Sequence, residues 1–563
     1  KSLQMNLSGK GAVMSKKKVR NPLIKRIPKE LIGDWKKYLV VFLFLVLTIG
    51  FVSGMYVANE SMLKSAADGV KEYKQEDGHF ELKKQADDAL LSAIETGEKA
   101  DVKQYYLDEA KKKLDKKFPK KFKSTFDEKF KSKFDAQFSA QVKQTLVAQG
   151  MDEQTVAAML PAAVKQAKAD GTYKNAYDKA YSSAYTDAYD KAYDEAWKKA
   201  QDKIEDKYAD AEEKYELNDP DFKATKTTVY ENFFRNEEED YNNDGKKDGT
   251  IRVFPQTEDI NLACLLKGSF PQTKDEIAID RMHADNVGVT VGDTITISGE
   301  TYKIVGLLAY VNYSTLHEKT TDLMFDALKF DVAMVTPEGF DRLHKSVHYT
   351  YAWKYENEPE DDAQEKIQSD NFMSALLTQV VVADNELEDY TPKYGNPAIN
   401  FATDDMGSDK AMGGVLLDIL IVIIAFIFAV TISNTIAKEA SAIGTLRASG
   451  YTKGELIRHY LSMPVIVTLL AAIVGNILGY TVFKNVVVSM YYNSYSLPTY
   501  YTIWNPDAFF KTTLIPVILM LVVNLIVIVR MMQHTPLQFL RHDLKKTKNK
   551  KAMRLPRWKF LSR

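Results

Sequence analysis

Hydrophobic residues in this chain gather in four nearly uninterrupted stretches, and the rest of the sequence is polar. The stretches cover residues 38–58, 411–437, 463–483 and 512–532. Each offers about 20 residues, which is the length that an α-helix needs to cross the hydrocarbon layer of a membrane. The pattern therefore predicts an α-helical membrane protein with four transmembrane helices.

Positive charges flank the first and the last apolar stretch and predict how the chain crosses the membrane. Residues 1–37 and 533–563 are both rich in Lys and Arg, and basic flanks stay on the cytoplasmic side. We therefore expect a multi-pass plasma membrane protein with both termini in the cytoplasm. Residues 59–410 and the loop 484–511 then lie outside, and 438–462 form a cytoplasmic loop.

The segment ahead of the first stretch mixes apolar, basic and Trp residues over positions 21–37. This composition favours an amphipathic elbow that lies in the cytoplasmic interface of the membrane; a merely basic flank is the alternative. Met14, followed by a basic run, is expected to be the true start. The first apolar stretch is too long for a cleaved signal peptide.

Aromatic residues recur at every fourth position in two runs between residues 101 and 215. This spacing predicts two amphipathic helices, joined by a turn near Gly150, that form a long antiparallel hairpin of the coiled-coil type. A period of four exceeds 3.6 and favours right-handed winding. We expect the stripes to be a packing seam; a groove for an acyl chain or glycan is the alternative. The aromatic residues are Phe118, Phe122, Phe126, Phe130, Phe134, Phe138, Tyr173, Tyr177, Tyr181, Tyr185, Tyr189, Tyr193 and Trp197.

Residues 220–405 differ in character from the predicted hairpin. Asp, Gly, Pro and β-branched residues become frequent, and alternating runs such as TITISG and TYKIVGLLAY predict strands. We expect one compact α/β module here, followed by a flexible junction at Gly413 and Gly414. The large extracytoplasmic part is thus predicted to be an α/β domain that carries the hairpin.

Composition excludes several classes of function. The chain has 75 Lys and Arg against 76 Asp and Glu, so it lacks the basic excess of a nucleic-acid-binding protein. Its single cysteine, Cys264, excludes an internal disulfide framework. No G-x-x-x-x-G-K-[ST] loop and no catalytic grouping is present, so we expect no enzyme and no cofactor bound by this chain.

One acidic turn resembles the first nine positions of a calcium-binding loop. Oxygen ligands would come from Asp240, Asn242, Asp244, the backbone of Lys246, and Asp248. The twelfth position lacks the bidentate Glu, so the predicted calcium site is weak. An ordinary solvated acidic turn is the alternative.

Small residues at a spacing of four occur in two of the predicted spans. Gly50 and Gly54 form one G-x-x-x-G pattern, and Gly475 and Gly479 form another. Such patterns allow two helices to approach closely. We expect helix packing within the chain, with a seam between two permease units as the alternative, and interhelical hydrogen bonds from Asn476 and Asn524.

Two blocks of sequence carry a resemblance to a known family. Residues 268–308 combine a G-x-x-P turn, a V-G-D turn and a strand pair that ends in V-G, as in the periplasmic core of MacB-like permeases. Residues 432–480 resemble the FtsX-type permease signature, and TPLQFLR at 535–541 resembles its P-x-x-x-L-R ending. The chain is thus similar to the FtsX/MacB-like ABC transporter permeases.

The resemblance implies that the loop 438–462 contains a short helix that rests on a separate ABC ATPase subunit. A loop that mixes charges with Ile443 and Leu446 can also bury a small apolar anchor against a partner. The expected coupling residues are Lys438, Glu439, Leu446, Arg447, Tyr451 and Glu455.

The expected function is that of a bacterial permease subunit that transmits ATPase-driven movement to its extracytoplasmic domain. Export or extraction of a lipid-linked or amphipathic molecule is the first hypothesis. The alternative is a non-transporting regulator of an extracellular partner, such as a cell-wall hydrolase. The family also leads us to expect a second permease unit, either as a dimer or through a second half that follows the basic tail.

Overall fold

The computed structural model describes residues 23–33, 35–215 and 217–544. Met14 and the end of the basic tail, from residue 545, lie outside these ranges. The predictions for a true start and for a following second half therefore have no structural counterpart.

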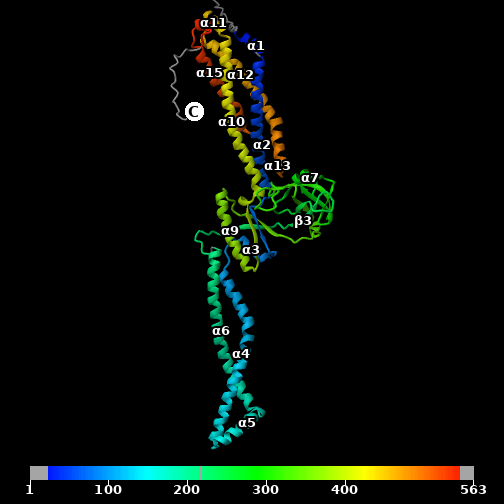
Figure 1. Ribbon diagram of the computed structural model, residues 1–563, viewed down its shortest axis with the longest axis vertical. Coiled ribbons are helices and arrows are strands. Elements are labelled where there is room, and N and C mark those ends of the chain that lie inside the picture. Colours follow the sequence, from blue (N-terminus) through cyan, green and yellow to red (C-terminus); the bar gives the residue numbers. More distant parts are fainter. Residues whose placement is uncertain (1–22, 34, 216, 545–563) are drawn as a thin grey trace, which may run out of the picture. The chain divides into compact units, whose positions relative to one another are not determined.

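The chain divides into two compact units (Figure 1). The first unit comprises residues up to 75, then 236–345, and all residues from 397 onward. The second unit comprises 76–235 and 346–396. The membrane helices and a seven-stranded sheet belong to the first unit, whereas the long helices of the predicted hairpin belong to the second.

Four helices among the described residues are long and apolar enough to cross a membrane, which confirms the four predicted spans. Large apolar side chains remain exposed along them; Val422 and Phe426, for example, are 68% and 69% exposed, as suits a lipid-facing surface. The candidate spans are Tyr38–Glu72, Pro397–Lys438, Lys453–Ser494 and Pro506–Met531. They are built from α2 (Trp35–Glu72), α10 (Pro397–Lys438), α12 (Lys453–Leu478) continued by η2 (Gly479–Phe483) and α13 (Lys484–Ser494), and α14 (Pro506–Phe509) continued by η3 (Phe510–Leu514) and α15 (Ile515–Met531).

The expected flexible junction at Gly413 and Gly414 is wrong. Both glycines lie inside α10, which runs without a break. Gly413 is buried, and a Cβ there would meet the side chain of Met55 on α2. These glycines therefore make room for a neighbouring helix instead of forming a hinge.

A seven-stranded mixed sheet forms the polar part of the first unit. Its strand order is β5-β8-β6-β9-β4-β3-β7. Because β7 also pairs with β8, the six strands from β8 to β7 in this order form a closed ring. Every residue of β9 is buried, which places this strand at the centre of the core. The elements are β3 (Arg235–Asp240), β4 (Gly249–Pro255), β5 (Ala263–Gly268), β6 (Glu276–Asp280), α7 (Arg281–Val287), β7 (Thr294–Ile297), β8 (Glu300–Tyr310), β9 (Phe330–Val335) and α8 (Pro337–Asp341).

The second unit contains an antiparallel sheet of order β11-β1-β10-β2. Phe80, Trp353 and Phe372 form its core, with Trp353 and Phe372 ring centroids 5.0 Å apart. Two helices, α3 and α9, contribute to the same cluster. The elements are β1 (Gly78–Leu82), α3 (Asp88–Glu95), β2 (Thr227–Glu231), β10 (Tyr349–Tyr355), α9 (Asp362–Val382) and β11 (Leu387–Pro392).

The predicted single module at 220–405 is therefore wrong. Its strands divide between two sheets, because β2, β10 and β11 assemble with β1, which precedes the hairpin in the sequence. β1 lies between β10 and β11 and hydrogen-bonds to both. The four strands therefore form a sheet of their own in the second unit, although β1 and β10 are far apart in the sequence.

Two long helices form the arms of the segment predicted as a hairpin. They are α4 (Val102–Ala148) and α6 (Thr172–Lys214), and their ribbons cross in Figure 1. The connection differs from the predicted simple turn, because a third helix, α5 (Glu153–Ala169), stands between the arms. Asp152 caps its first turn by accepting a hydrogen bond from the backbone N–H of Thr155.

The aromatic stripes of α4 and α6 face one another in antiparallel register. Phe118 contacts Tyr193 with ring centroids 5.4 Å apart, and Phe138 contacts Tyr173 at 5.1 Å, both edge to face. Within each helix the rings stack on the next ring four residues on, for example Phe122 on Phe126 at 5.5 Å. Edge-to-face pairs add to the burial of the rings. The stripes are thus a packing seam between the two helices.

Hydroxyl groups of the tyrosine stripe bond to carboxylates on the opposite helix. Tyr173 donates to Asp135, and Tyr193 donates to Asp115. Burial and the bond to Asp135 raise the pKa of Tyr173 to about 12. The bond to Asp115, followed by burial, raises the pKa of Tyr193 to about 12.

We expect alkaline pH to unfold the α4–α6 seam. A tyrosine ionises near pH 10 in an unfolded chain, about two units below the folded value of Tyr173 and Tyr193. The stabilisation is therefore complete below about pH 10 and is lost as the pH rises toward about 12. Circular dichroism of a fragment of residues 101–215 should show a loss of helix over this window. An Asp115→Asn variant lacks the charge that disfavours ionisation of Tyr193, so it should lose less stability between pH 10 and about 12. Identical pH dependence of the helical signal in the two proteins would contradict a role of Asp115 in this transition.

Candidate functional site

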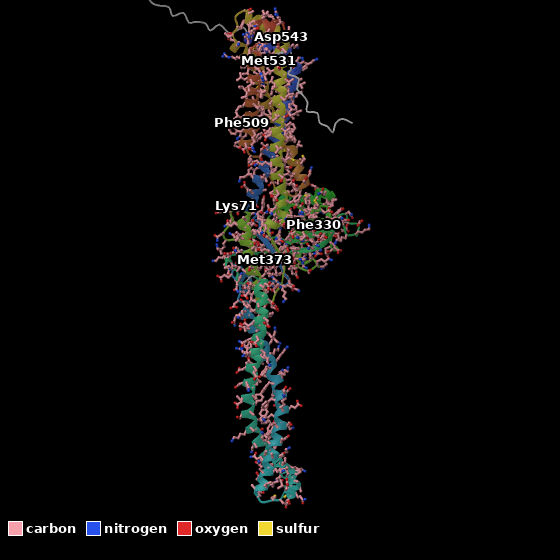
Figure 2. The ribbon with its side chains drawn as sticks, turned by 60° about the vertical axis from the view of Figure 1, so that its left-hand side comes forward. Lys71, Phe330, Met373, Phe509, Met531 and Asp543 are labelled. Atoms are coloured by element: carbon pink, nitrogen blue, oxygen red, sulfur yellow. The ribbon has the colours of Figure 1, made fainter. Side chains whose placement is uncertain are left out.

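A small helical cap closes one end of the membrane helices. It consists of α11 (Ala440–Ala448), which follows α10, and α16 (Pro536–Leu540), which follows α15. The two helices touch at Gly444, where a Cβ would lie 3.1 Å from the backbone nitrogen of Leu540. Met531 and Asp543 mark this end of the chain in Figure 2.

A buried apolar cluster holds the cap to the spans. Ile443 on α11, Leu456 on α12 and Phe539 on α16 are fully buried together. Burial of such side chains is worth roughly 1.5–3 kcal/mol each. Leu446 and Tyr451, two of the predicted coupling residues, pack at the edge of the same cluster. The apolar anchor expected for a partner therefore faces this chain's own helices.

Glu439 connects the cap to two other helices. Its carboxylate accepts hydrogen bonds from Arg26 of α1 (Leu23–Gly33), at 3.1 Å, and from the hydroxyl of Tyr460 on α12, at 2.7 Å. The segment predicted as an amphipathic elbow thus contains α1, whose Arg26 is an ion-pair partner of Glu439. Glu439 thus ties the start of α11 to α1 and α12.

Arg447 binds the end of the last span. Its guanidinium donates to the backbone carbonyls of Met532, at 3.3 Å, and of His534. These carbonyls follow the last turn of α15, where a helix leaves acceptors without partners and where a cation is favoured. Arg447 therefore joins α11 to α15, and its charge is directed into the protein.

The remaining predicted coupling residues have other surroundings. Glu455 forms a capping box with Thr452 at the start of α12. Lys438 is exposed at the end of α10. Sequence reasoning missed the exposed leucines of α16, Leu537 and Leu540, which are 55% and 45% exposed. Their positions in the P-x-x-x-L-R ending could have suggested them.

The four predicted glycines lie at the crossing of α2 and α12. A Cβ on Gly475 would lie 2.9 Å from the Cβ of Ile49, and one on Gly479 would lie 3.0 Å from the carbonyl oxygen of Gly50. A Cβ on Gly54 would lie 2.6 Å from the Cβ of Phe483. The two G-x-x-x-G patterns therefore pack against each other and η2 within one chain.

Asn476 is the centre of a polar cluster beside this crossing. Its amide donates to Thr513 at 2.8 Å, and its carbonyl oxygen accepts from Ser53 at 2.9 Å and from Thr512 at 3.3 Å. The cluster joins α2, α12 and η3. Interhelical hydrogen bonds of this kind contribute about 0.6–2 kcal/mol each.

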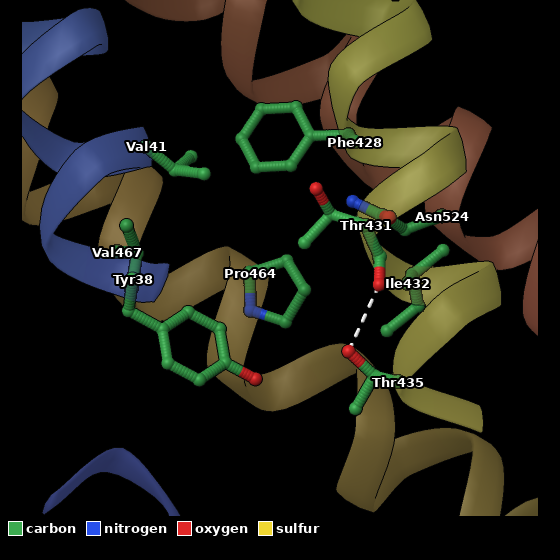
Figure 3. A pocket seen from close by; sticks show the side chains of 9 residues that line it. All are labelled: Tyr38, Val41, Phe428, Thr431, Ile432, Thr435, Pro464, Val467 and Asn524. Carbon is green, nitrogen blue, oxygen red and sulfur yellow. Dashed lines mark hydrogen bonds between the residues drawn. The ribbon is translucent and has the colours of Figure 1, made fainter. Parts of the chain in front are cut away.

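The side chain of Asn524, the other predicted hydrogen-bonding residue, makes no hydrogen bond to the described residues and instead lines a small internal cavity (Figure 3). The cavity measures about 10 Å³, which is the space needed for a single water molecule. Asn524 is fully buried on α15 beside Thr431 and Thr435 of α10. A cavity of this size between the spans is too small to carry a cargo.

At the other end of the spans, α2 and α10 continue directly into the polar part of the first unit. Just past the end of α2, Gln75 donates to the carbonyl of Val311 at 2.5 Å, and the carbonyl of Tyr73 accepts from Leu262. At the start of α10, the carbonyl of Ala398 accepts from Ser314 at 2.7 Å. Both helices are therefore bonded to loops of the seven-stranded sheet.

The loop between α13 and α14 ties the same parts together. Tyr501 and Ile503 donate backbone N–H groups to Ser65 and Ser61 of α2, at 3.2 and 3.1 Å. Arg281 of α7 donates to the carbonyl of Tyr495 at 2.6 Å. Three of the four spans thus attach to the sheet through direct hydrogen bonds or a continuous helix.

Two open hollows lie on the first unit near these attachments. One, of about 330 Å³, is lined by Tyr56, Lys410 and Lys511 together with small residues of α10. The other, of about 850 Å³, is lined by apolar and polar side chains that include Tyr73, Phe270 and Met334. Both volumes fall within the range of roughly 300–1,000 Å³ of small-molecule sites, the smaller hollow at its lower limit.

The predicted calcium loop is a tight turn between β3 and β4. Both carboxylate oxygens of Asp240 accept backbone N–H groups, from Asp244 at 3.0 Å and Gly245 at 2.9 Å. Asn242 directs its amide nitrogen to Asp248 at 3.3 Å, and Lys246 pairs with Asp244. The hydrogen bond from Lys246 lowers the pKa of Asp244. These bonds occupy several predicted ligand atoms, and calcium binding stays a prediction.

Comparison with known proteins identifies the membrane part of the chain. Residues 414–536 match the family model of the FtsX-like permease C-terminal domain. No curated protein matches the chain. Among solved structures, the periplasmic region of MacB from Actinobacillus actinomycetemcomitans is similar at 8% sequence identity and a TM-score of 0.18, over 32% of this chain and 77% of that one. The part of the chain from within α10 to the first residue of α16 is therefore similar to the FtsX-like permease C-terminal domain.

Proposed function

We propose that this chain is the permease subunit of an ATP-binding-cassette system and transmits ATPase-driven movement across the plasma membrane to its extracytoplasmic part. The observation that carries the proposal is the continuity of α2 and α10. Each runs without a break from the spans to the hydrogen-bonded loops of the seven-stranded sheet. A rotation or tilt imposed at the cap reaches the sheet without passing through a flexible linker.

The cap is the proposed contact with the separate ATPase. Glu439 and Arg447 hold α11 on the spans, so a push on α11 moves α10, α12 and α15 together. The exposed side chains of Leu537 and Leu540 would form the apolar centre of this contact, and the exposed Arg541, which directly follows Leu540 in the chain, would belong to its polar rim. An apolar centre with a polar rim is the usual composition of a protein–protein interface.

Cargo handled at the outer face suits this arrangement better than cargo in a central channel. The spans pack through glycines and apolar side chains, and the cavity at Asn524 has room for only one water. The hollow of about 850 Å³ beside Tyr73 lies where α2 meets the sheet, so its shape would follow the movement of α2. A lipid-linked or amphipathic molecule is the proposed cargo.

Regulation of an extracellular partner is the second candidate. It is favoured by α4 and α6, which present long, charged outer surfaces while their aromatic residues pack inward. A protein-binding arm would use these surfaces, whereas cargo handling would use the hollow beside Tyr73. Both functions need the ATPase and a second permease unit.

Substitution of Leu537 by Asp should weaken the complex with the cognate ATPase. A charge at the centre of an interface costs about 2 kcal/mol or more, which corresponds to at least a 30-fold loss of affinity. The measurement is co-purification of the co-expressed ATPase and the stimulation of its ATP hydrolysis. Leu323→Asp is the matched control, because Leu323 is 92% exposed on the polar part of the first unit. Equal binding by both variants would exclude α16 as the contact.

A further inference from the structure

Three fully buried side chains meet inside the seven-stranded sheet of the first unit. Glu239 comes from β3, His283 from α7 and Asp331 from β9. Each offers one ligand atom, and these atoms lie within 4.8 Å of one another. Neither the motifs nor the family resemblance draws attention to these residues.

The polar atoms that face one another in this cluster lack hydrogen bonds from the described residues. They are both carboxylate oxygens of Glu239, Nε2 of His283 and Oδ2 of Asp331. Buried carboxylates without partners are costly, because they have lost their hydration and gained nothing in return. Two carboxylates and an imidazole nitrogen in this arrangement are a set of ligands that suits a metal cation.

Two of the three side chains, those of His283 and Asp331, are held in place by hydrogen bonds to the backbone. Nδ1 of His283 lies 2.8 Å from the carbonyl oxygen of Ala327. A carbonyl can only accept, so Nδ1 carries a proton, and in the neutral imidazole that binds a metal Nε2 presents its lone pair to the cluster. This is the arrangement in which metal-bound histidines are oriented by an outer hydrogen bond.

Asp331 is oriented in the same manner. Its Oδ1 accepts the backbone N–H of Val332 at 2.7 Å and that of Asp280 at 3.2 Å, which leaves Oδ2 directed to the cluster. Asp280 also caps α7 by accepting from Met282 and His283, and so fixes the helix that carries the histidine. Two ligands are thus positioned before any ion binds.

The separation of His283 and Glu239 suits two ligands of one metal ion. Nε2 lies 3.3 Å from Oε1. Charge-assisted hydrogen bonds are shorter, at about 2.7–2.9 Å. Ligands at about 2.0–2.2 Å from a tetrahedral zinc ion lie roughly 3.3–3.6 Å from one another. The observed distance matches the edge of such a tetrahedron.

We propose that Glu239, His283 and Asp331 bind one divalent transition metal ion, for which Zn²⁺ is the best match. One imidazole nitrogen and two carboxylate oxygens suit zinc, and a water molecule would complete four-fold coordination. The ion would join β3, α7 and β9. Asp280, which also accepts from Ser496 of the loop between α13 and α14, places the site beside an attachment of the spans.

Metal content of the purified, tag-free full chain tests the proposal. After removal of loosely bound ions, we expect about one equivalent of zinc, manganese or iron per chain by elemental analysis. Glu239→Gln, His283→Gln and Asp331→Asn should each weaken zinc binding about 100-fold or more, because each removes a direct ligand. His317→Gln, a buried histidine of the same unit, is the matched control and should keep the metal. Wild-type protein that takes up no zinc would overturn the site, as would full metal content in all three variants.

A second measurement keeps the test valid if the variants fail to fold. Wild-type protein stripped with a chelator should melt at a temperature that rises with the zinc concentration, since an ion that binds only the folded state stabilises it. Cobalt added to the same protein should give the visible absorption bands of tetrahedral coordination. A melting temperature independent of zinc, together with featureless cobalt spectra, would identify the cluster as a buried ion triad with a protonated histidine.

Discussion

Replacement of Gly54 by leucine is expected to separate α2 from the junction of η2 and α13 and to lower the melting temperature of the detergent-solubilised protein sharply. Even a Cβ at this position would lie 2.6 Å from the Cβ of Phe483 and 2.8 Å from the backbone nitrogen of Lys484. One is a backbone atom and the other is the first atom of a side chain, so neither can move aside unless the helix itself moves. Overpacking of this kind costs about 3 kcal/mol or more, or roughly 6–12 °C in a domain of this size.

The matched control is a leucine at Gly407. This glycine lies on α10, and a Cβ there would meet nothing within 4 Å. Gly407→Leu should therefore melt within about 1–2 °C of the wild type, since surface substitutions stay within roughly 0.5 kcal/mol. Equal melting temperatures for the two variants would show that the crossing at Gly54 tolerates separation.

The membrane helices could be predicted because their signal is local. About 20 consecutive apolar residues allow no other structure in a bilayer. The extensions of α2 and α10 beyond these windows could not be predicted in the same way. Ser61 and Ser65 of α2 are polar residues, and they are buried because they bond to the loop that contains Tyr501 and Ile503. Such tertiary bonds leave no periodic pattern in the sequence.

The division of the sheets also depends on contacts between distant residues. β1 has only five residues, Gly78–Leu82, and its burial alternates as in many short strands. Nothing in that segment specifies that it pairs with β10 and β11, which come after both the hairpin and the seven-stranded sheet in the sequence. The alternation of apolar and polar residues predicts the strands of residues 220–405, but it does not specify which strands pair with one another.

The candidate sites illustrate the same contrast. The acidic turn at 240–248 was found because its residues are contiguous, although its carboxylates are largely used by the turn itself. Glu239, His283 and Asp331 were missed because they stand on three separate elements. For the cap, the resemblance predicted a short helix in the loop 438–462, but only the structure reveals that Glu439 and Arg447 bond inward. The direction in which a side chain points depends on how the helices pack, and the spacing of residues in the sequence does not determine it.

Replacement of Tyr181, Tyr185 and Tyr189 by serine is expected to remove most of the stability of the α4–α6 seam. Each ring contacts two phenylalanines of α4; that of Tyr185, for example, lies 5.4 Å from Phe122 and 5.2 Å from Phe126. The rings are half-buried, so each contributes about 1 kcal/mol of burial, and the edge-to-face pairs contribute about 0.5–1.5 kcal/mol more. The triple variant should therefore lose about 4.5 kcal/mol or more in a fragment of residues 101–215.

The triple Tyr→Phe variant at the same positions separates the rings from their hydroxyl groups. It keeps every ring contact and loses only the hydrogen bond from Tyr181 to Asp127, so it should lose about 1 kcal/mol. The measurement is denaturant unfolding followed by circular dichroism, because a seam that holds two helices together should melt cooperatively. A serine variant as stable as the wild type would mean that α4 and α6 are helical for local reasons alone. If the phenylalanine variant were as unstable as the serine variant, the stabilisation would come from the tyrosine–aspartate hydrogen bonds and not from the stacked rings.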